Sequence, residues 1–443
     1  MSLLPETSRR VTELTSVAQA RGRVPSLLVG VVRERALVHL AGAGEHPRAD
    51  AKTQYRVGAI TKSMTAAMVM QLRDEGWFGL DDLLYRHLPG TPIGGVTLRQ
   101  LLAHVAGLQR EPDGAWWRRG DGPRHDAFLA DLAFDKLAHP PYQTFHYSDL
   151  AYGLLGAVLA RVTGESWHHL LHKRLLEPLA MKRTTYQPVE PYARGYVVHP
   201  WHGTLREEPR ADARAMAPAG QLWSTLADLA KWAAFLADPT PTVLARGTLD
   251  EMCAPVVISD LESWTAGYGL GLQLWRVGER VYAGHCGAMP GYQATLAVHR
   301  PTRTAVVAFA NAHTLHGGET LGALGRRILT EVLDREPAPP APWRPAPAPP
   351  PEVAALCGRW WWMGREYDAA WRPEADQLVI TPLTVPERTP WRFTREGRDR
   401  WRGRSGRNDG ETLAVRRDDR GAVTALEIAG ARLTRRPDDP PAR

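Results

Sequence analysis

The residues with the clearest chemical potential lie in the stretch YRVGAITKSMTAAMVMQLRDEGWFGLDD, where Lys62 follows Ala59 by three positions. Residues three apart share one face of a helix, so both are expected on the same first turn. A lysine amine placed in this way can deprotonate a hydroxyl at the first position, as in an S-x-x-K motif, provided that burial or nearby charge lowers the lysine pKa. The spacing predicts acyl-transfer chemistry at position 59, although Ala59 itself carries no hydroxyl.

Two further short motifs follow along the chain. Tyr147-Ser148-Asp149 occupies the place of a Y-S-N motif, in which the phenol relays a proton. His285-Cys286-Gly287 occupies the place of a K-T-G or H-x-G strand, where the imidazole assists proton traffic or grips a substrate carboxylate. The backbone N–H groups of residues 59 and 288 are expected to form an oxyanion hole. Each motif alone has an ordinary structural explanation, and only their order and spacing together support the prediction.

The elements that must position these residues read as two domains and a linker. The pattern of strands appears in VPSLLVGVV, ALVHLAG and YQATLAVHR, and residues 61–76 have the pattern of a long helix. Residues 1–335 are therefore predicted to form an α+β or α/β sandwich. Nine of the sixteen residues from 336 to 351 are proline, which favours an extended spacer. Residues 352–443 contain short β-like runs separated by Gly, Asp, Asn and Pro, which predicts a small all-β barrel.

Composition excludes several classes of function. The formal net charge is +7, and residues 388–407 include eight arginines among aromatic residues. Nucleic-acid binding is one interpretation, but arginines on the outer faces of short strands are favoured over it. Three widely spaced cysteines show no metal spacing, so we expect free thiols and no metal or cofactor. With no export-type apolar core and no membrane-spanning run, the sequence predicts a cytoplasmic protein.

Four segments of the chain resemble the β-lactamase-related serine hydrolase family. They are RVGAITKSMTAAMVMQLRDEGWFGLDD, TLRQLLAHVAGL, HYSDLAYGLLGAVLARVTGESW and GHCGAMPGY. That family includes class C β-lactamases, D,D-peptidases, D-aminopeptidases and esterases. The resemblance covers residues 20 to 330 and implies a serine β-lactamase/transpeptidase-like α/β sandwich. It also implies that Lys62 is the base, Tyr147 the proton relay and His285 the group that assists the attacking amine, with Gly287 beside the substrate.

A narrower resemblance rests on EPDGAWW, PAGQLWSTLADLAKWAAFL, GHCGAMPGY and the final LTRRP. These segments are similar to the standalone penicillin-binding-protein-type thioesterases of nonribosomal peptide pathways, the surugamide cyclase group. The resemblance implies a lipocalin-like C-terminal domain and a peptidyl thioester substrate on a carrier protein. The implied reaction is head-to-tail macrolactam formation through a seryl acyl-enzyme. A cytoplasmic esterase or D-aminopeptidase would share the same residues but use water as the acceptor.

Two positions depart from the family pattern. Because Ala59 has no hydroxyl, the chain as written cannot form the acyl-enzyme, and neither Thr61 nor Ser63 faces the right way to replace it. Either a serine has been replaced deliberately, which the retained Lys62 favours, or the protein is a natural peptide-binding pseudoenzyme. Asp149 stands in place of the usual Asn, and it can pair with Lys62 or bind a substrate amine.

The tryptophans near these motifs have two interpretations. Trp116, Trp117 and Trp223 fall in segments that border the cleft in this family, so they are candidate substrate-binding residues that would offer rigid apolar walls to a peptide. Packing in the protein core is the alternative explanation for each.

Overall fold

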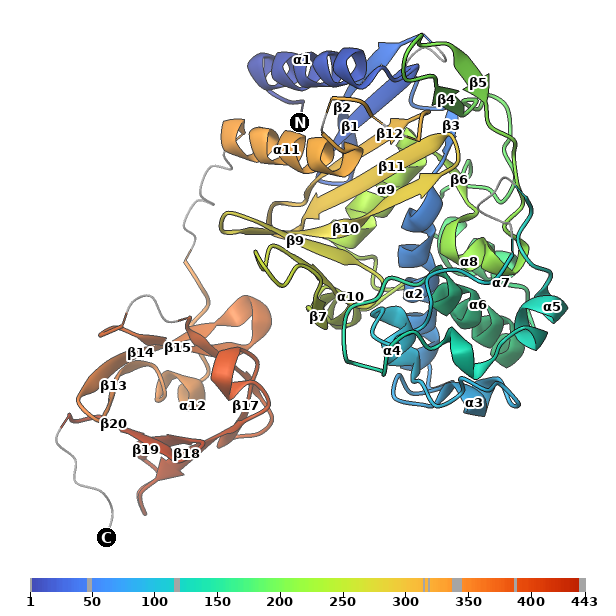
Figure 1. The fold of residues 1–443 in the computed structure, drawn as a ribbon. Helices are drawn as coiled ribbons and strands as arrows, with labels where there is room; N and C mark the ends of the chain where they lie inside the picture. The colour runs from blue at the N-terminus through green and yellow to red at the C-terminus, as the bar shows by residue number, and fades with distance from the viewer. Residues whose placement is uncertain are drawn as a thin grey trace. The chain divides into compact units, whose positions relative to one another are not determined.

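The computed structural model describes residues 2–45, 50–114, 120–313, 315–317, 319–336, 345–385 and 389–437. The chain forms two compact units, Met1–Ala338 and Pro339–Arg443 (Figure 1). The first is an α/β unit built on one large sheet, and the second is a closed β-barrel. This confirms the predicted fold class of a β-lactamase-like domain followed by a C-terminal barrel.

The first unit is organised by an eight-stranded sheet with the order β2-β1-β12-β11-β10-β9-β8-β7, in which neighbouring strands are antiparallel. The strands are β1 (Ser26–Arg33), β2 (Ala36–Gly44), β7 (Val257–Ile258), β8 (Ala266–Tyr268), β9 (Gln273–Val277), β10 (Arg280–Met289), β11 (Tyr292–His299) and β12 (Thr304–Ala310). Two small sheets join β3 (Gln54–Arg56) to β6 (Trp223–Thr225) and β4 (Tyr196–Val198) to β5 (Leu205–Glu207).

Helices cover both faces of the large sheet because its central strands are apolar on both sides. On β1, Leu28 belongs to one buried cluster and Val29 to the other, as expected from the alternation of side chains along a strand. Helices α1 (Pro5–Gly22) and α11 (Leu321–Arg335) pack on one face, and α9 (Leu226–Ala237) packs on the opposite face (Figure 1).

A helical region packs against the same face as α9. It contains α2 (Thr61–Asp74), α3 (Leu84–His87), α4 (Leu98–Leu102), α5 (His125–Ala130), α6 (Asp149–Thr163), α7 (Trp167–Leu171), α8 (Ala217–Gly220) and α10 (Arg246–Met252). Every residue of α2 from Thr61 to Leu72 is buried, which marks α2 as the central helix of this region. The predicted helix after position 60 is therefore present, and it ends at Asp74, two residues before Gly76 with φ of 80°.

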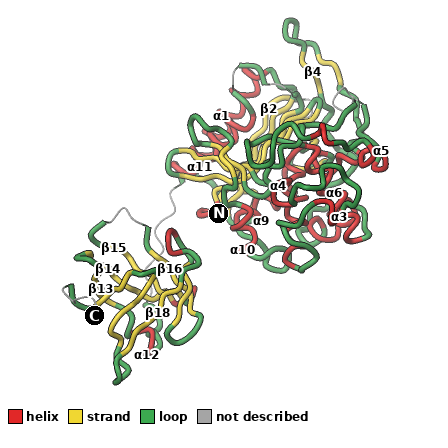
Figure 2. The backbone as a smooth tube through the Cα atoms, turned by 60° about the horizontal axis from the view of Figure 1, so that its bottom comes forward, coloured by secondary structure: helices red, strands yellow, loops and turns green. Residues whose placement is uncertain are grey.

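The second unit is a closed barrel of β13 (Gly358–Trp362), β14 (Arg365–Arg372), β15 (Gln377–Pro382), β16 (Trp391–Arg395), β17 (Arg400–Gly403), β18 (Thr412–Arg417), β19 (Val423–Ile428) and β20 (Ala431–Thr434). One short helix, α12 (Pro351–Ala354), precedes them (Figure 2). Large side chains fill its interior, among them Trp360, Phe393 and Trp401, which are fully buried.

The arginine-rich stretch of the barrel lies on its strands and turns. Arg395 pairs with Glu352 at 2.8 Å, and Arg400 and Arg402 pair with Glu396 at 3.1 and 2.8 Å. These ion pairs fit the interpretation of arginines on outer strand faces.

Candidate active site

Ala59 lies in the short 3₁₀ turn Gly58–Ile60, which continues directly into α2. Gly58 has φ of 53°, and a side chain there would place Cβ 2.7 Å from the Ala288 nitrogen on β10. Glycine therefore allows the start of α2 to approach the strand closely. Ala59 lines a cavity of about 830 Å³, here called the Ala59 cavity, which runs between α6, α8, β10, β11 and the start of α11.

Lys62 is fully buried beneath this cavity and forms an ion pair with the Asp149 carboxylate. Its ammonium also donates to the Ala219 carbonyl at 3.0 Å and lies 4.8 Å from the ring centroid of Tyr147. Burial acts to raise the pKa of Asp149, but the ammonium of Lys62, together with Glu111 and Arg110, holds that pKa below its usual value. Of the two roles expected for Asp149, pairing with Lys62 is the one the structure shows.

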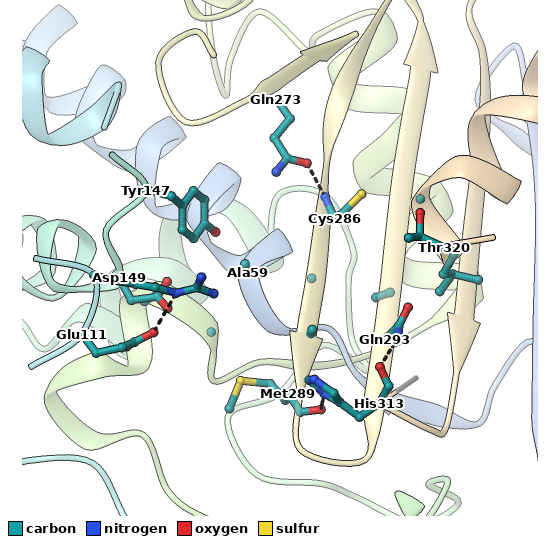
Figure 3. A pocket seen from close by; sticks show the side chains of 18 of the residues that line it. Ala59, Glu111, Tyr147, Asp149, Gln273, Cys286, Met289, Gln293, His313 and Thr320 are labelled. Carbon is teal, nitrogen blue, oxygen red and sulfur yellow. Dashed lines mark hydrogen bonds and ion pairs between the residues drawn. The ribbon is translucent and has the colours of Figure 1, made fainter. Parts of the chain in front are cut away.

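Tyr147 lines the Ala59 cavity beside Asp149 (Figure 3). Ser148 holds the chain at this point, because its side chain accepts from the Ala151 N–H at the start of α6 and its own N–H donates to His104 Nδ1 at 3.0 Å. The ring of His104 lies 4.3 Å from that of Tyr147. Burial raises the pKa of the Tyr147 phenol well above its usual value, so the group is neutral and can pass a proton between neighbours.

His285 does not line the Ala59 cavity, so the assistance to an attacking amine expected of it would have to pass through other residues. The imidazole is fully buried, and Nδ1 donates to the Cys286 carbonyl at 2.6 Å. Nε2 must then accept from the Tyr268 hydroxyl at 2.8 Å, because the buried ring is neutral. Its ring centroid lies 6.3 Å from that of Tyr147, so His285 supports the wall behind the phenol.

The burial of His285 predicts a pH-dependent stability. Burial, with a smaller effect of Lys62, lowers its pKa from 6.5 to about 3. Below pH 6.5 the unfolded chain binds a proton that the folded chain does not, so stability falls as the pH falls towards 3. Lowering the pH from 7 to 5 should therefore reduce the free energy of unfolding by about 2 kcal/mol through this residue. Urea unfolding at both pH values should show that His285→Gln loses less unfolding free energy between pH 7 and 5 than the parent chain. An equal loss in the two proteins would contradict a buried neutral imidazole at this position.

The edge of β10 carries the N–H group that is expected to act as an oxyanion donor. β9 pairs with β10 only as far as Gly284, and beyond that point the Cys286 N–H donates to the Gln273 side chain at 2.9 Å. N–H groups two residues apart point to the same edge of a strand, so the Ala288 N–H points past the end of β9 towards the start of α2. This places it beside residue 59, where the two N–H groups can stabilise one oxyanion.

Gly287 has a clear steric reason to be glycine. A Cβ at this position would lie 2.0 Å from the Val57 carbonyl oxygen and 2.9 Å from the Ala59 nitrogen. No side chain fits there, so the glycine allows the oxyanion edge of β10 to pack on the helix start. Gly287 also lines the Ala59 cavity, as expected of a residue beside the substrate.

Thr61 and Ser63 lie where the spacing predicted. Both are fully buried, and the Ser63 hydroxyl donates to the Ile60 carbonyl at 2.7 Å and accepts from Trp232 Nε1 at 3.0 Å. Neither residue lines the Ala59 cavity, so neither can replace a hydroxyl at position 59.

The structure places Trp223 in the protein core, which corrects its assignment as a substrate-binding residue. The side chain is 1% exposed, contacts the ring of Tyr292 edge-on at 5.2 Å, and lies 5.9 Å below the Arg56 guanidinium. It does not line the Ala59 cavity. Trp116 and Trp117, the other two tryptophans expected at the cleft, lie outside the described residues.

The core position of Trp223 predicts a loss of stability without a loss of ligand binding. Trp223→Phe removes part of a buried ring system and should lower the free energy of unfolding by about 1–2 kcal/mol. Thermal or urea unfolding measures this change, and titration with a peptide ligand at 25 °C should give an unchanged Kd. A weakened Kd with unchanged stability would instead indicate that Trp223 contacts the ligand in the cleft.

Sequence reasoning missed several residues around the site. Tyr268 and His104 are buried against Tyr147, and Glu111 lines the cavity beside Asp149 (Figure 3). His104 stands inside TLRQLLAHVAGL, so that segment was the available signal for it, whereas no local pattern marks Tyr268. Among the described residues no group of three His, Cys, Asp or Glu side chains could hold a metal ion, and no helix is long and apolar enough to cross a membrane.

Comparison with known proteins decides the family. The family model described as "Beta-lactamase" matches residues 11–329. The chain belongs to the β-lactamase family. Members of this family are serine hydrolases and acyltransferases. A second model, a domain of unknown function (DUF7586), matches residues 349–435 and covers the barrel.

Three similar proteins illustrate the range of this family. "Beta-lactamase-like protein 2" of Dictyostelium discoideum is 29% identical over 63% of this chain, which spans only 53% of that protein. A D-stereospecific amidohydrolase from Streptomyces sp. is 25% identical, with a TM-score of 0.62 over 73% of this chain and 97% of its own. The structure of SurE with D-Leu is 25% identical, with a TM-score of 0.58 over 98% of this chain and 100% of its own.

Proposed function

We propose that this protein with a serine at position 59 is a peptide cyclase, which takes a peptidyl group from a carrier-protein thioester and releases it by head-to-tail amide formation. The observation that carries the proposal is the position of residue 59, whose N–H lies beside that of Ala288 and which lines the cavity above the buried Lys62–Asp149 pair. The likeness to SurE along nearly the whole chain supports a cyclase in preference to other family activities.

The first half-reaction follows from this geometry. For Lys62 to act as the base, its ammonium first passes a proton to the paired Asp149 carboxylate. The serine oxygen then attacks the thioester carbonyl, and its proton passes to the neutral Lys62 amine. The carbonyl oxygen becomes an oxyanion held by the N–H groups of residues 59 and 288. The C–S bond then breaks, the thiol leaves with a proton relayed by Tyr147, and an ester joins the peptide to the enzyme.

In the second half-reaction the N-terminal amine of the same peptide attacks the ester carbonyl. An amide bond forms, the C–O bond to the enzyme breaks, and the amine proton returns through Tyr147 to the serine oxygen. His285 acts here as a positioning residue, because its contact with Tyr268 fixes the wall behind Tyr147. Excluding water favours the amine over hydrolysis at this step.

Two other functions have an observation in their favour. The likeness to a D-stereospecific amidohydrolase favours a hydrolase that passes the acyl group to water. The missing hydroxyl of Ala59 favours a peptide-binding protein without activity. The first shares every step of the proposed mechanism up to the ester, and the second shares only the cavity.

One experiment separates the three. The Ala59→Ser protein is incubated with a linear peptidyl thioester ending in a D-residue, and the products are identified by mass spectrometry. A product one water lighter than the linear acid is expected. Linear acid alone would mean a hydrolase, and an untouched substrate would mean a binding protein.

A further inference from the structure

The wall of the Ala59 cavity opposite Tyr147 carries a cation that the mechanism does not use. Arg326 extends from α11 and lines the same cavity as Ala59. Its guanidinium lies 4.9 Å from the ring centroid of Trp275 on β9, which supports one face of the planar group. A guanidinium stacked in this way keeps its N–H donors in the plane, where they are available to a ligand.

Arg326 differs from the other arginines of α11 in having no acidic partner. Arg327 pairs with Glu319 at 2.6 Å, and Arg335 pairs with Glu331 at 2.9 Å. In the described part of the chain, no carboxylate lies within ion-pair distance of Arg326; its polar neighbour is the Cys286 thiol. A partly buried cation facing a cavity without a counter-ion is a site at which an anion can gain charge-assisted hydrogen bonds.

Small residues keep the path from Ala59 to Arg326 open. A Cβ on Gly322 would lie 2.6 Å from Cys286 Sγ and 3.3 Å from Arg326 Nη1. Any larger residue would therefore fill the space between β10 and the guanidinium. Cys286 and Gly287 form the floor of the same path, so an extended ligand can reach from position 59 to Arg326.

The charges of the cavity are also distributed unequally. At the end near Tyr147 the charges balance, because Glu111 lies 3.5 Å from Arg110 and Asp149 pairs with Lys62. Figure 3 shows Glu111 and Asp149 at this end. The end near α11 has Arg326 and the neutral side chains of Gln273 and Thr320. A ligand with a negative group on the α11 side therefore matches the cavity electrostatically.

We propose that Arg326 binds an anionic oxygen group of the acyl donor while the reacting carbonyl lies at position 59. The group is a phosphate on the leaving thiol arm or a carboxylate of the acyl chain, since both present the paired oxygens that a guanidinium binds through two N–H groups. This inference rests on the proposed acyl transfer from a thioester, because it names the substrate feature that the same cavity selects.

Equilibrium binding tests this without any turnover, because the chain with Ala59 can bind a thioester but has no nucleophile to consume it. Three matched probes are titrated by calorimetry: a linear peptidyl thioester of pantetheine 4′-phosphate, the same peptide on unphosphorylated pantetheine, and that neutral thioester with one added side-chain carboxylate. Arg326→Gln should weaken binding of one anionic probe roughly 10- to 100-fold and leave the neutral probe unchanged. Arg327→Gln is the matched control, because it removes the same charge one residue away.

Each outcome either assigns Arg326 to one part of the acyl donor or overturns the proposal. Selective loss of the phosphate probe assigns Arg326 to the leaving arm, and selective loss of the carboxylate probe assigns it to the acyl chain. Equal Kd values for Arg326→Gln and Arg327→Gln with every probe would overturn the proposal, as would equal weakening of neutral and anionic probes by Arg326→Gln. Failure of the proposed function would appear separately, as no turnover of the neutral thioester by Ala59→Ser.

Discussion

Ala59→Ser is expected to raise the rate of thiol release from a peptidyl thioester by about 10⁴- to 10⁶-fold, the range lost when a catalytic serine is removed from a preformed site. The reason is that every other part of the site is already in place. Lys62 is held beneath position 59, Tyr147 lines the cavity, and the Ala288 N–H lies at the open edge of β10. Thiol release is followed with a chromogenic thiol reagent, and the acyl-enzyme is detected by intact-protein mass spectrometry.

The control for this gain is the double variant Ala59→Ser with Lys62→Met. It carries the hydroxyl but lacks the base, so its rate should stay close to that of the parent chain. If Ala59→Ser alone also leaves the rate at the parent level, the site lacks a component that serine cannot supply. That result would favour a protein that binds peptides without transforming them.

Lys62→Met is expected to lower the free energy of unfolding by about 3–5 kcal/mol at pH 7, because it leaves the Asp149 carboxylate buried without its counter-ion. Asp149 is 4% exposed, so water cannot replace the ammonium. Urea unfolding followed by tryptophan fluorescence measures the change. The double variant with Asp149→Asn removes the stranded charge and should recover a large part of the loss.

The pH dependence of Lys62→Met gives a second readout with a definite sign. In the parent chain, Lys62 with Glu111 and Arg110 outweighs burial and the pKa of Asp149 is lowered, so this group adds stability above pH 3.8 and loses it as the pH falls. Without Lys62, burial acts against only the weaker effects of Glu111 and Arg110, so the pKa of Asp149 rises and the folded state binds a proton more readily than in the parent chain. Lys62→Met should therefore become more stable between pH 7 and 5 relative to its double variant with Asp149→Asn. A parallel pH profile for the two proteins would contradict a buried ion pair.

The parts of the site set by local spacing were predictable from the sequence. Lys62 follows position 59 by one helical turn, and Ser148 caps the helix that follows Tyr147, so both depend on hydrogen bonds within a few residues. The orientation of His285 was not predictable in the same way. A strand turns alternate residues to opposite faces, and only the packing of β10 against α2 and α11 decides that His285 is buried while Cys286 faces the cavity.

The fold shows the same limit. Segments with a long apolar or periodic pattern, such as β1 and α2, are predictable because the pattern itself marks which residues are buried. In the barrel, REYDAAWR forms β14 on a weak pattern, because small and polar residues make up most of the strand. The continuous β-like pattern of ALEIAGARLTRR divides between β19 and β20, which are joined at Gly430 with φ of 83°. Short strands draw their stability from neighbours across the barrel, and this information is not local.

The burial of α2 has a practical consequence for the chain with Ala59. From Ile60 to Leu72 every residue is buried, and Ala59 is the residue at this helix start that reaches the cavity. An exchange between serine and alanine therefore changes one oxygen atom facing the cavity and leaves the packing beneath it intact. The chain as it stands is thus expected to retain the acyl donor that an active enzyme would consume. Incubated with carrier proteins that bear peptidyl thioesters and then recovered, it should hold the donor in a form that mass spectrometry can identify.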